Sequence, residues 1–296
     1  MFDWLFFTEV LIAGLLSGVM YSLVALGFVI IFKASGVFNF AQGAMVLFAA
    51  LTFVRLVEMG WPFFVALVAT MAAMVVLAIL IERLVLRPLV HQEAIILFMA
   101  TIGLNFFIEG AAQGLWDSDV HPLDLGIPDV PIEVAGMLIS QFDLVAAAMV
   151  AVLVTMLMVF FQKTAVGRAL RAVADDHQAA LSVGIPLKTI WIIVWSVAGL
   201  VALVAGLVWG SKLGVQFSVS LVALKALPVL ILGGFTSIPG AIIGGLIIGA
   251  GEKLGEVFIG PYIGGAIENW IPYMLAMVFL LFRPQGLFGE KIIERV

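Results

Sequence analysis

The sequence predicts an all-α, polytopic membrane protein with eight or nine crossings, two Gly-interrupted segments and a weak internal repeat. Hydrophobic residues make up 64% of the 296 residues, charged residues 11%, and the mean hydropathy is +1.24. A soluble domain carries roughly 25% charged residues, so this chain cannot cover a water-facing surface. The apolar runs reach the ~20 residues that a helical bilayer crossing needs, and the ~10-residue alternating segments of an outer-membrane barrel are not visible.

Charge and cysteine content exclude several functions. A net charge of −5 without a basic cluster argues against binding to nucleic acid. The absence of Cys excludes a disulfide scaffold, thiol catalysis and a Cys-ligated metal. The first basic residue is Lys33, so the start of the chain lacks the basic head of a cleavable signal peptide, and we expect the first apolar run to be a retained span.

The apolar segments define the expected elements in order, with one membrane domain over 1–296. Segments 37–57 and 221–236 are interrupted or short, which leaves eight and nine crossings both open. The expected segments are 10–32, 37–57, 62–82, 94–112, 142–162, 189–211, 221–236, 238–258 and 262–282.

Basic residues in short loops predict the orientation, because such loops stay in the cytoplasm. The loop at about 113–141 is acidic, and no Lys or Arg occurs between Pro88 and Gln162, so this loop is expected outside. With nine crossings the N-terminus is periplasmic and the C-terminus cytoplasmic. Eight crossings require an inside N-terminus and a re-entrant 37–57. The residues assigned to the cytoplasm are Lys33, Arg83, Arg87, Lys163, Arg168, Arg171, Lys188, Arg283, Lys291 and Arg295.

A five-residue string suggests an internal repeat. Ser22–Leu26 recurs letter for letter as Ser220–Leu224, and both copies lead into a Gly-rich break, at Gly36–Gly43 and at Gly233–Gly245. Paired breaks in the two halves of a transporter indicate its substrate path. Chance coincidence in so biased a composition is the alternative.

The two breaks supply candidate residues for a translocation pathway, because freed peptide groups must face protein or water rather than lipid. Asn39 and Gln42 share a helical face if the helix resumes there, and could offer amide groups to a polar solute. Alternatively they satisfy broken backbone groups or bond a neighbouring helix. The candidates are Asn39, Gln42, Gly36, Gly43, Gly234, Ser237 and Gly240.

Small residues and charges at the spans have simpler interpretations. The glycines at 14 and 18, and at 240, 244 and 249, predict close helix packing. A charge at the bilayer centre is costly, so the charged residues near the predicted outer ends are interpreted as interface anchors. These are Glu109, Lys225, Glu252, Lys253, Glu256 and Glu268.

The inside loop at about 163–188 predicts a short amphipathic helix. Leu170, Val173, His177 and Leu181 share one stripe, and Gly184 followed by Pro186 ends the helix. Such a helix suits docking into a groove of a partner, or else it lies on the lipid surface.

Five motifs are distributed along nearly the whole chain. They are Gly14-Leu15-x-x-Gly18-x-x-Tyr21-Ser22-Leu23, Gly36-x-x-Asn39-Phe40-Ala41-x-Gly43, Gly167-Arg168-Ala169-x-Arg171-Ala172 with Asp176 and Gly184-Ile185, Gly233-Gly234-x-x-Ser237-x-x-Gly240-Ala241-x-x-Gly244-Gly245, and Phe282-Arg283-Pro284-Gln285-Gly286-Leu287-Phe288. Together they resemble the permease subunit of bacterial ABC importers for branched-chain amino acids, a family shared with urea and other small-solute importers.

The resemblance implies an inner-membrane transport subunit. Its partners would be a second homologous permease, which could be a related chain or another copy, two cytoplasmic ATPases and a periplasmic substrate-binding protein. The family has His where this chain has Gln42, which leaves the solute open among branched-chain amino acids, urea and aromatic acids. The implied ATPase-coupling residues are Gly167, Arg168, Arg171, Asp175, Asp176 and Gly184.

The residues themselves exclude ATP hydrolysis by a Walker A loop. No G-x-x-x-x-G-K-[ST] string is present, so we expect no bound cofactor and ATP hydrolysis by partner subunits. A free-standing channel or secondary transporter is the alternative. An intramembrane enzyme is disfavoured, because the three histidines fall outside the predicted spans.

Overall fold

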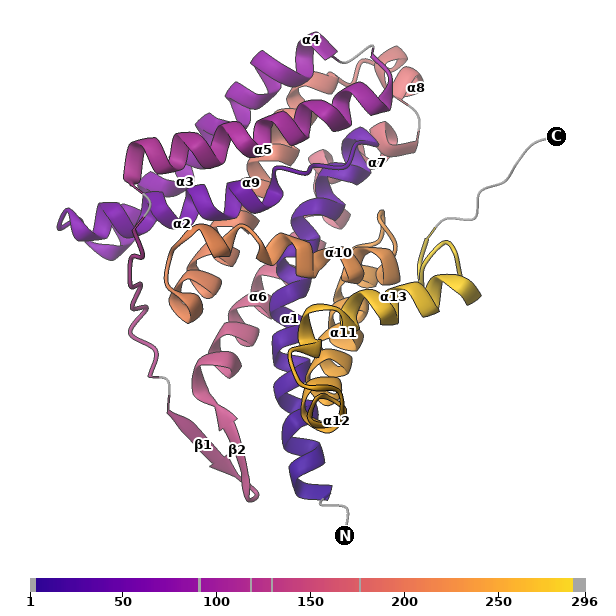
Figure 1. Cartoon of the computed structure of the whole chain (residues 1–296). Coiled ribbons are helices and arrows are strands. Elements are labelled where there is room, and N and C mark those ends of the chain that lie inside the picture. Colours follow the sequence, from indigo (N-terminus) through magenta and orange to yellow (C-terminus); the bar gives the residue numbers. More distant parts are fainter. Residues whose placement is uncertain (1–3, 90–91, 118, 129, 176, 290–296) are drawn as a thin grey trace. The chain divides into compact units, whose positions relative to one another are not determined.

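The computed structural model describes residues 4–89, 92–117, 119–128, 130–175 and 177–289, and it is predominantly helical (Figure 1). The helices are α1 (Trp4–Ser35), α2 (Gln42–Glu58), α3 (Phe63–Ile81), α4 (Arg87–Leu89), α5 (Ala94–Trp116), α6 (Gln141–Lys163), α7 (Ala165–Asp175), α8 (His177–Ser182), α9 (Leu187–Leu213), α10 (Val222–Gly233), α11 (Ile238–Phe258), α12 (Gly260–Ile263) and α13 (Ile271–Phe282). A π-helical turn, η1 (Glu82–Leu86), joins α3 to α4, and the 3₁₀ turns η2 (Phe217–Val219) and η3 (Ile267–Asn269) precede α10 and α13.

The chain forms two compact units, each built from segments that are distant in sequence. Unit 1 comprises Met1–Ala25, Gly126–Val154 and Leu224–Val296, and unit 2 comprises Leu26–Leu125 and Thr155–Ala223. Neither unit is continuous in the sequence, so the single expected domain has no boundary that a linker could mark.

The core of unit 2 forms where α2 packs against α3, α5 and α9, with α3 also against α9 (Figure 1). Most of α2 is buried, including the fully enclosed Phe53. Gly206 permits the close approach of α9, since a Cβ there would lie 2.7 Å from the Val46 carbonyl oxygen. Helix α2 is therefore an interior element, packed between other helices of its unit.

Unit 1 is held together by small residues between the N-terminal part of α1 and α11. A Cβ at Gly18 would lie 2.3 Å from the carbonyl oxygen of Gly245, and one at Gly14 would lie 2.8 Å from that of Gly249. The predicted close packing of glycines is confirmed here. Gly244 of α11 packs instead against α10, where a Cβ added to Gly244 would lie 2.6 Å from the Val229 carbonyl oxygen.

The expected spans correspond to helices, although several of their bounds differ. Among the described residues, five helices are long and apolar enough to cross a membrane, or six if α10 and α11 with η2 count as one broken span bent by 114°. Helix α2 has 17 residues, because it begins only at Gln42, after the break that follows α1. Helix α13 has 12 residues, because a break at 264–266 and the turn η3 replace the helix expected from 262. The chain is a multi-pass membrane protein, and eight or nine crossings stays a prediction.

The acidic loop contains structure that the sequence analysis did not predict. Strands β1 (Pro131–Val134) and β2 (Met137–Ser140) form an antiparallel hairpin with Ile132 opposite Ile139. Gly136, with φ of +81°, lies in its two-residue turn, where the left-handed conformation favours glycine.

Candidate functional site

The first break places two buried amides side by side in unit 2. Asn39 and Gln42 are both fully buried. The Asn39 Nδ2 donates to Gln42 Oε1 at 3.4 Å, and its Oδ1 accepts from the backbone N–H of Ala41 at 3.1 Å. Asn39 thus satisfies a backbone group just before α2 begins, which is one of the two roles that the sequence left open.

Gln42 retains an unsatisfied donor. Its Nε2 has no hydrogen-bond partner among the described residues, although the side chain is completely enclosed. Gly27 makes the room, because a Cβ there would lie 2.1 Å from this nitrogen. Gly43, the next residue, packs against the Ser220 carbonyl. Gly36 is exposed and ends α1 in the left-handed conformation that favours glycine at a helix C-terminus.

The candidates of the second break belong to unit 1, whereas those of the first belong to unit 2. Ser237 caps α11 by accepting the N–H of Gly240 at 3.0 Å. Gly240 lies tightly against Gly233 of α10, and Gly234 has a φ of +100°. These residues make the sharp bend between α10 and α11 possible.

The expected coupling helix is present in unit 2 as two helices, α7 and α8. Gly167 allows the turn after α6, because a Cβ there would lie 2.0 Å from the Phe161 carbonyl oxygen. Arg171 donates to that same carbonyl and caps the C-terminus of α6. Arg168 is exposed, and its guanidinium has no partner among the described residues. Asp175 ends α7, and Asp176 lies outside the described residues.

An exposed apolar tip follows α7. Leu181 is 50% exposed and Val183 74% exposed. Gly184, with φ of +84°, donates to the Leu181 carbonyl at 3.0 Å, which ends α8 as the sequence predicted. The expected stripe is divided, since Leu170 and Val173 are buried whereas Leu181 is exposed.

A cavity of about 360 Å³ lies beside this tip within unit 2. Two of its lining residues form an ion pair: the Arg87 guanidinium donates two hydrogen bonds, of 3.1 and 2.8 Å, to the carboxylate of Glu82, which is 1% exposed. The remaining lining is Leu181, Pro186, Leu187, Lys188 and Trp191. The cavity mixes apolar walls with an excess of positive charge.

A charged cluster buried in unit 1 corrects one interpretation of the sequence. Glu252, expected as an interface anchor, is 1% exposed. Its Oε1 accepts from the Tyr21 hydroxyl at 2.9 Å and from Lys225 Nζ at 3.2 Å, while its Oε2 has no partner among the described residues. Sequence reasoning missed this cluster, because its members come from three helices and share no motif.

Unit 2 carries a closed ring of four charged side chains at the loop after α5. Arg55 contacts Glu58 at 2.8 Å and Asp117 at 3.0 Å, and His121 contacts the same two carboxylates at 2.9 Å each. Burial lowers the pKa of His121, but its hydrogen bonds and the negative charges of Asp117 and Glu58 outweigh burial and raise it above 6.5. Backbone bonds between His121 and Val215 fix the loop against the end of α9.

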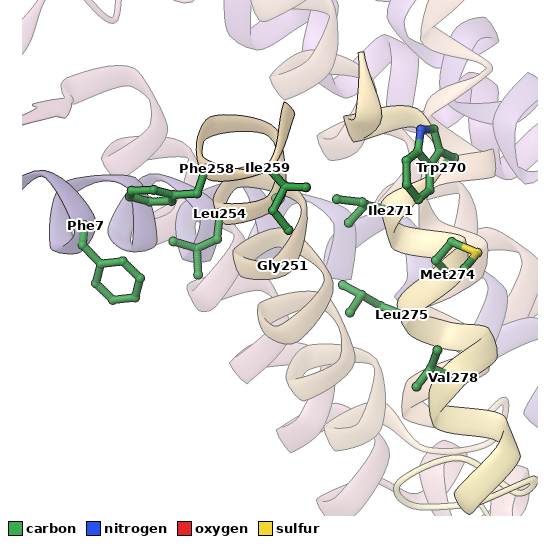
Figure 2. Close-up of a pocket in the computed structure, with 11 residues that line it drawn as sticks. Phe7, Gly251, Leu254, Phe258, Ile259, Trp270, Ile271, Met274, Leu275 and Val278 are labelled. Carbon is green, nitrogen blue, oxygen red and sulfur yellow. The ribbon is translucent and has the colours of Figure 1, made fainter. Parts of the chain in front are cut away.

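A groove of about 610 Å³ in unit 1 is apolar throughout (Figure 2). Side chains of α11, among them Leu254 and Phe258, face Met274 and Leu275 of α13, and Phe7 of α1 lies at its edge (Figure 2). Of the residues that the structure describes, no charged side chain lines it. Such a groove accepts hydrocarbon but cannot hold the charged groups of a solute.

The sequence as a whole matches known transport proteins. Residues 10–283 match the family model described as branched-chain amino acid transport system, permease component. The chain is 28% identical over 306 residues to the high-affinity branched-chain amino acid transport system permease protein BraD of Pseudomonas aeruginosa, covering 98% of each. It is 27% identical over 312 residues to LivH of Escherichia coli K12, covering 99% of each.

A more distant relative and a solved structure complete the comparison. The probable branched-chain amino acid transport permease protein LivH of Methanocaldococcus jannaschii is 27% identical over 281 residues, covering 90% of this chain and 88% of that one. The solved structure of PsaBC from Streptococcus pneumoniae in complex with Fab is 16% identical, with a TM-score of 0.45 over 91% of this chain and 89% of that chain. The family model spans nearly the whole chain, so the chain belongs to the family of permease components of branched-chain amino acid transport systems.

Proposed function

We propose that this chain is the permease subunit of an ABC importer of the inner membrane that moves branched-chain or other hydrophobic amino acids. The family and the full-length similarity to BraD and LivH support this proposal. The observation that carries the coupling to ATP is the α7–α8 segment. It offers an exposed apolar tip and the exposed Arg168, the pattern expected of a segment that docks into another protein.

We assign this segment to the cytoplasm and the acidic loop to the periplasm. The N-terminal end of α1 lies beside the hairpin of that loop, since Glu9 accepts from the backbone N–H of Leu138 at 3.0 Å. This contact supports placing the N-terminal end of α1 and the loop on the same side of the membrane, as the distribution of basic residues predicts. The C-terminus belongs to the other side.

Transport by this subunit requires partners. A periplasmic binding protein delivers the solute to the outer face, a second permease completes the pathway, and two ATPases bind the α7–α8 segments. The cavity next to Leu181 extends the surface offered to an ATPase, and its excess positive charge favours an acidic partner surface. ATP-driven closure of the ATPases then moves α7 and α8 and switches the permeases between outward and inward access.

The candidate pathway residues divide into two kinds. Gly36, Gly234, Ser237 and Gly240 support the backbone of the breaks. Gln42 is the candidate for solute contact, because its buried Nε2 finds no acceptor in the described part of the chain.

Reconstitution tests the proposal against the alternative of a free-standing channel or secondary transporter for a small polar solute such as urea. We expect the chain with its partner permease, ATPases and loaded binding protein to take up leucine into proteoliposomes only with ATP. Uptake of leucine or urea by the chain alone, without ATPase subunits, would refute it.

A charge reversal tests the docking surface. Arg168→Glu should abolish ATP-dependent uptake and the stimulation of ATP hydrolysis by the loaded binding protein while the protein remains inserted. Lys163→Glu, which reverses a charge at the end of α6 outside α7 and α8, is the matched control and should retain both. Equal activities of the two variants would remove the docking role of Arg168.

A further inference from the structure

Tyr21, Lys225 and Glu252 form a buried cluster in unit 1. Glu252 is enclosed, and its Oε2 lacks any donor among the described residues. The Lys225 side chain is 28% exposed, so it forms the accessible side of the cluster. Its ammonium lies 5.9 Å from the centre of the Tyr21 ring, where the ring face stabilises a cation.

Packing alone does not account for this arrangement. Charged side chains within membrane-spanning segments are costly and mark substrate or ion paths. A buried ion pair contributes little stability unless its remaining hydrogen-bonding capacity is satisfied, and Glu252 leaves one oxygen unsatisfied. The cluster therefore keeps an acceptor that only another donor can satisfy.

We propose that Lys225 and Glu252 hold the two charged ends of a zwitterionic amino acid as it passes through the membrane. This inference rests on the proposed function. The ammonium of Lys225 takes the α-carboxylate of the solute, and the carboxylate of Glu252 takes its α-ammonium. Tyr21 keeps the Glu252 side chain in place through its hydroxyl.

Charge balance favours a zwitterion over other solutes. When an amino acid inserts between Lys225 and Glu252, one ion pair is exchanged for two, and no buried charge is left uncompensated. An oxo acid without the ammonium leaves Glu252 unpaired, and an amine without the carboxylate leaves Lys225 unpaired. A neutral solute such as urea cannot replace either charge.

The backbone makes the distance between the two charges adjustable. Lys225 lies on α10 and Glu252 on α11, the two arms that meet at 114° across the break with Gly234 and Ser237. Discontinuous helices with such breaks form the binding sites of many transporters. A change in the angle between the arms would open or close the space between Lys225 and Glu252.

The test uses the complete importer, with both permeases and the ATPases, and measures two quantities. The first is ATP-driven uptake of leucine from saturating loaded binding protein. The second is the rise in thermal-unfolding temperature of the importer, without binding protein, on addition of millimolar leucine, 4-methyl-2-oxopentanoate or 3-methylbutylamine. For the wild type we expect only leucine to raise the unfolding temperature.

Two variants remove charge from the pair, and the double variant leaves neither charge unpaired. Glu252→Gln is isosteric, and Lys225→Met combined with Glu252→Gln neutralises the whole pair. We expect either to lose the leucine-dependent shift and to reduce uptake by roughly tenfold or more, while ATP hydrolysis persists. Glu256→Gln is the control on the same helix, since Glu256 accepts from the backbone N–H groups of Ala266 and Glu268 rather than from a charged side chain of the described residues.

The possible results distinguish failure of this inference from failure of the proposed function. Uptake and leucine shift within twofold of wild type in the neutral-pair variant would overturn the inference, as would an equal shift with the oxo acid or the amine. Failure of both variants to assemble would make the pair purely structural and also overturn it. A wild-type importer that moves no amino acid would instead refute the proposed function.

Discussion

Replacing Gly18 by Ala should separate α1 from α11 in unit 1. A Cβ at Gly18 would lie 2.3 Å from the Gly245 carbonyl oxygen, 2.9 Å from the carbonyl carbon and 3.0 Å from the Leu246 Cα. All three are backbone atoms, so no side-chain rotation can relieve the overlap. The helices must move apart by about 0.7 Å locally merely to reach a contact of 3.0 Å.

The expected loss of stability follows from two opposing effects. Overpacking of a close contact costs about 1–3 kcal/mol, and a gap of 0.5–1 Å forfeits roughly a quarter to a half of each neighbouring dispersion contact. Against this, Ala gains up to about 1 kcal/mol over Gly within a helix. We expect a net loss of about 1–2 kcal/mol, which lowers the unfolding temperature by roughly 2–8 °C.

Thermal unfolding of the detergent-solubilised protein, followed by tryptophan fluorescence, measures this effect. Gly103→Ala in α5 is the matched control, because a Cβ there meets nothing within 4 Å. The control should unfold at or slightly above the wild-type temperature. If Gly18→Ala unfolds no earlier than Gly103→Ala, α1 and α11 do not pack as described.

Three further changes test other contacts. Gly27→Ala places a Cβ 2.1 Å from Gln42 Nε2 and should lower the unfolding temperature by several degrees in the wild type but little in a Gln42→Ala background; equal effects would contradict this contact. The raised pKa of His121 stabilises the fold below the unfolded-state value of 6.5, and this stability is lost as the pH rises through the higher folded-state pKa. Unfolding temperatures at about pH 6 and about pH 9 should therefore differ more in the wild type than in His121→Asn. The same difference in both proteins would show that His121 does not form its ion pairs with Glu58 and Asp117. Gly167→Ala overlaps the backbone at the end of α6 and should impair ATP-dependent uptake, whereas the Gly103 variant should transport normally.

The positions of the apolar helices were predictable from composition. The expected segment 238–258 coincides with α11, and 142–162 differs from α6 by one residue at each end. Long apolar runs specify helices almost regardless of context, since lipid leaves backbone groups no other partner. The glycines at 14 and 18 also predicted close packing, because small residues are what allow two membrane helices to approach.

The partners of polar residues were not predictable. Tyr21 and Glu252 are separated by 231 positions, and no periodic pattern connects residues so distant. The same holds for His121, whose two carboxylate partners lie on different elements. Only the assembled fold shows that Glu252 is buried, because an isolated Glu near the end of an apolar run has the same sequence signature as an interface anchor.

The discontinuity of unit 1 has a consequence for how the chain is made. Its first segment leaves the ribosome long before α11, which packs on it, has been translated. At ordinary synthesis rates of about 5–20 residues per second, the delay is roughly 10–45 s. During that interval the glycine-lined face of the nascent α1 has no native neighbour, so insertion machinery or lipid must shield it until the carboxyl-terminal quarter arrives. Truncated products would expose this face permanently, which makes them natural targets for membrane proteases.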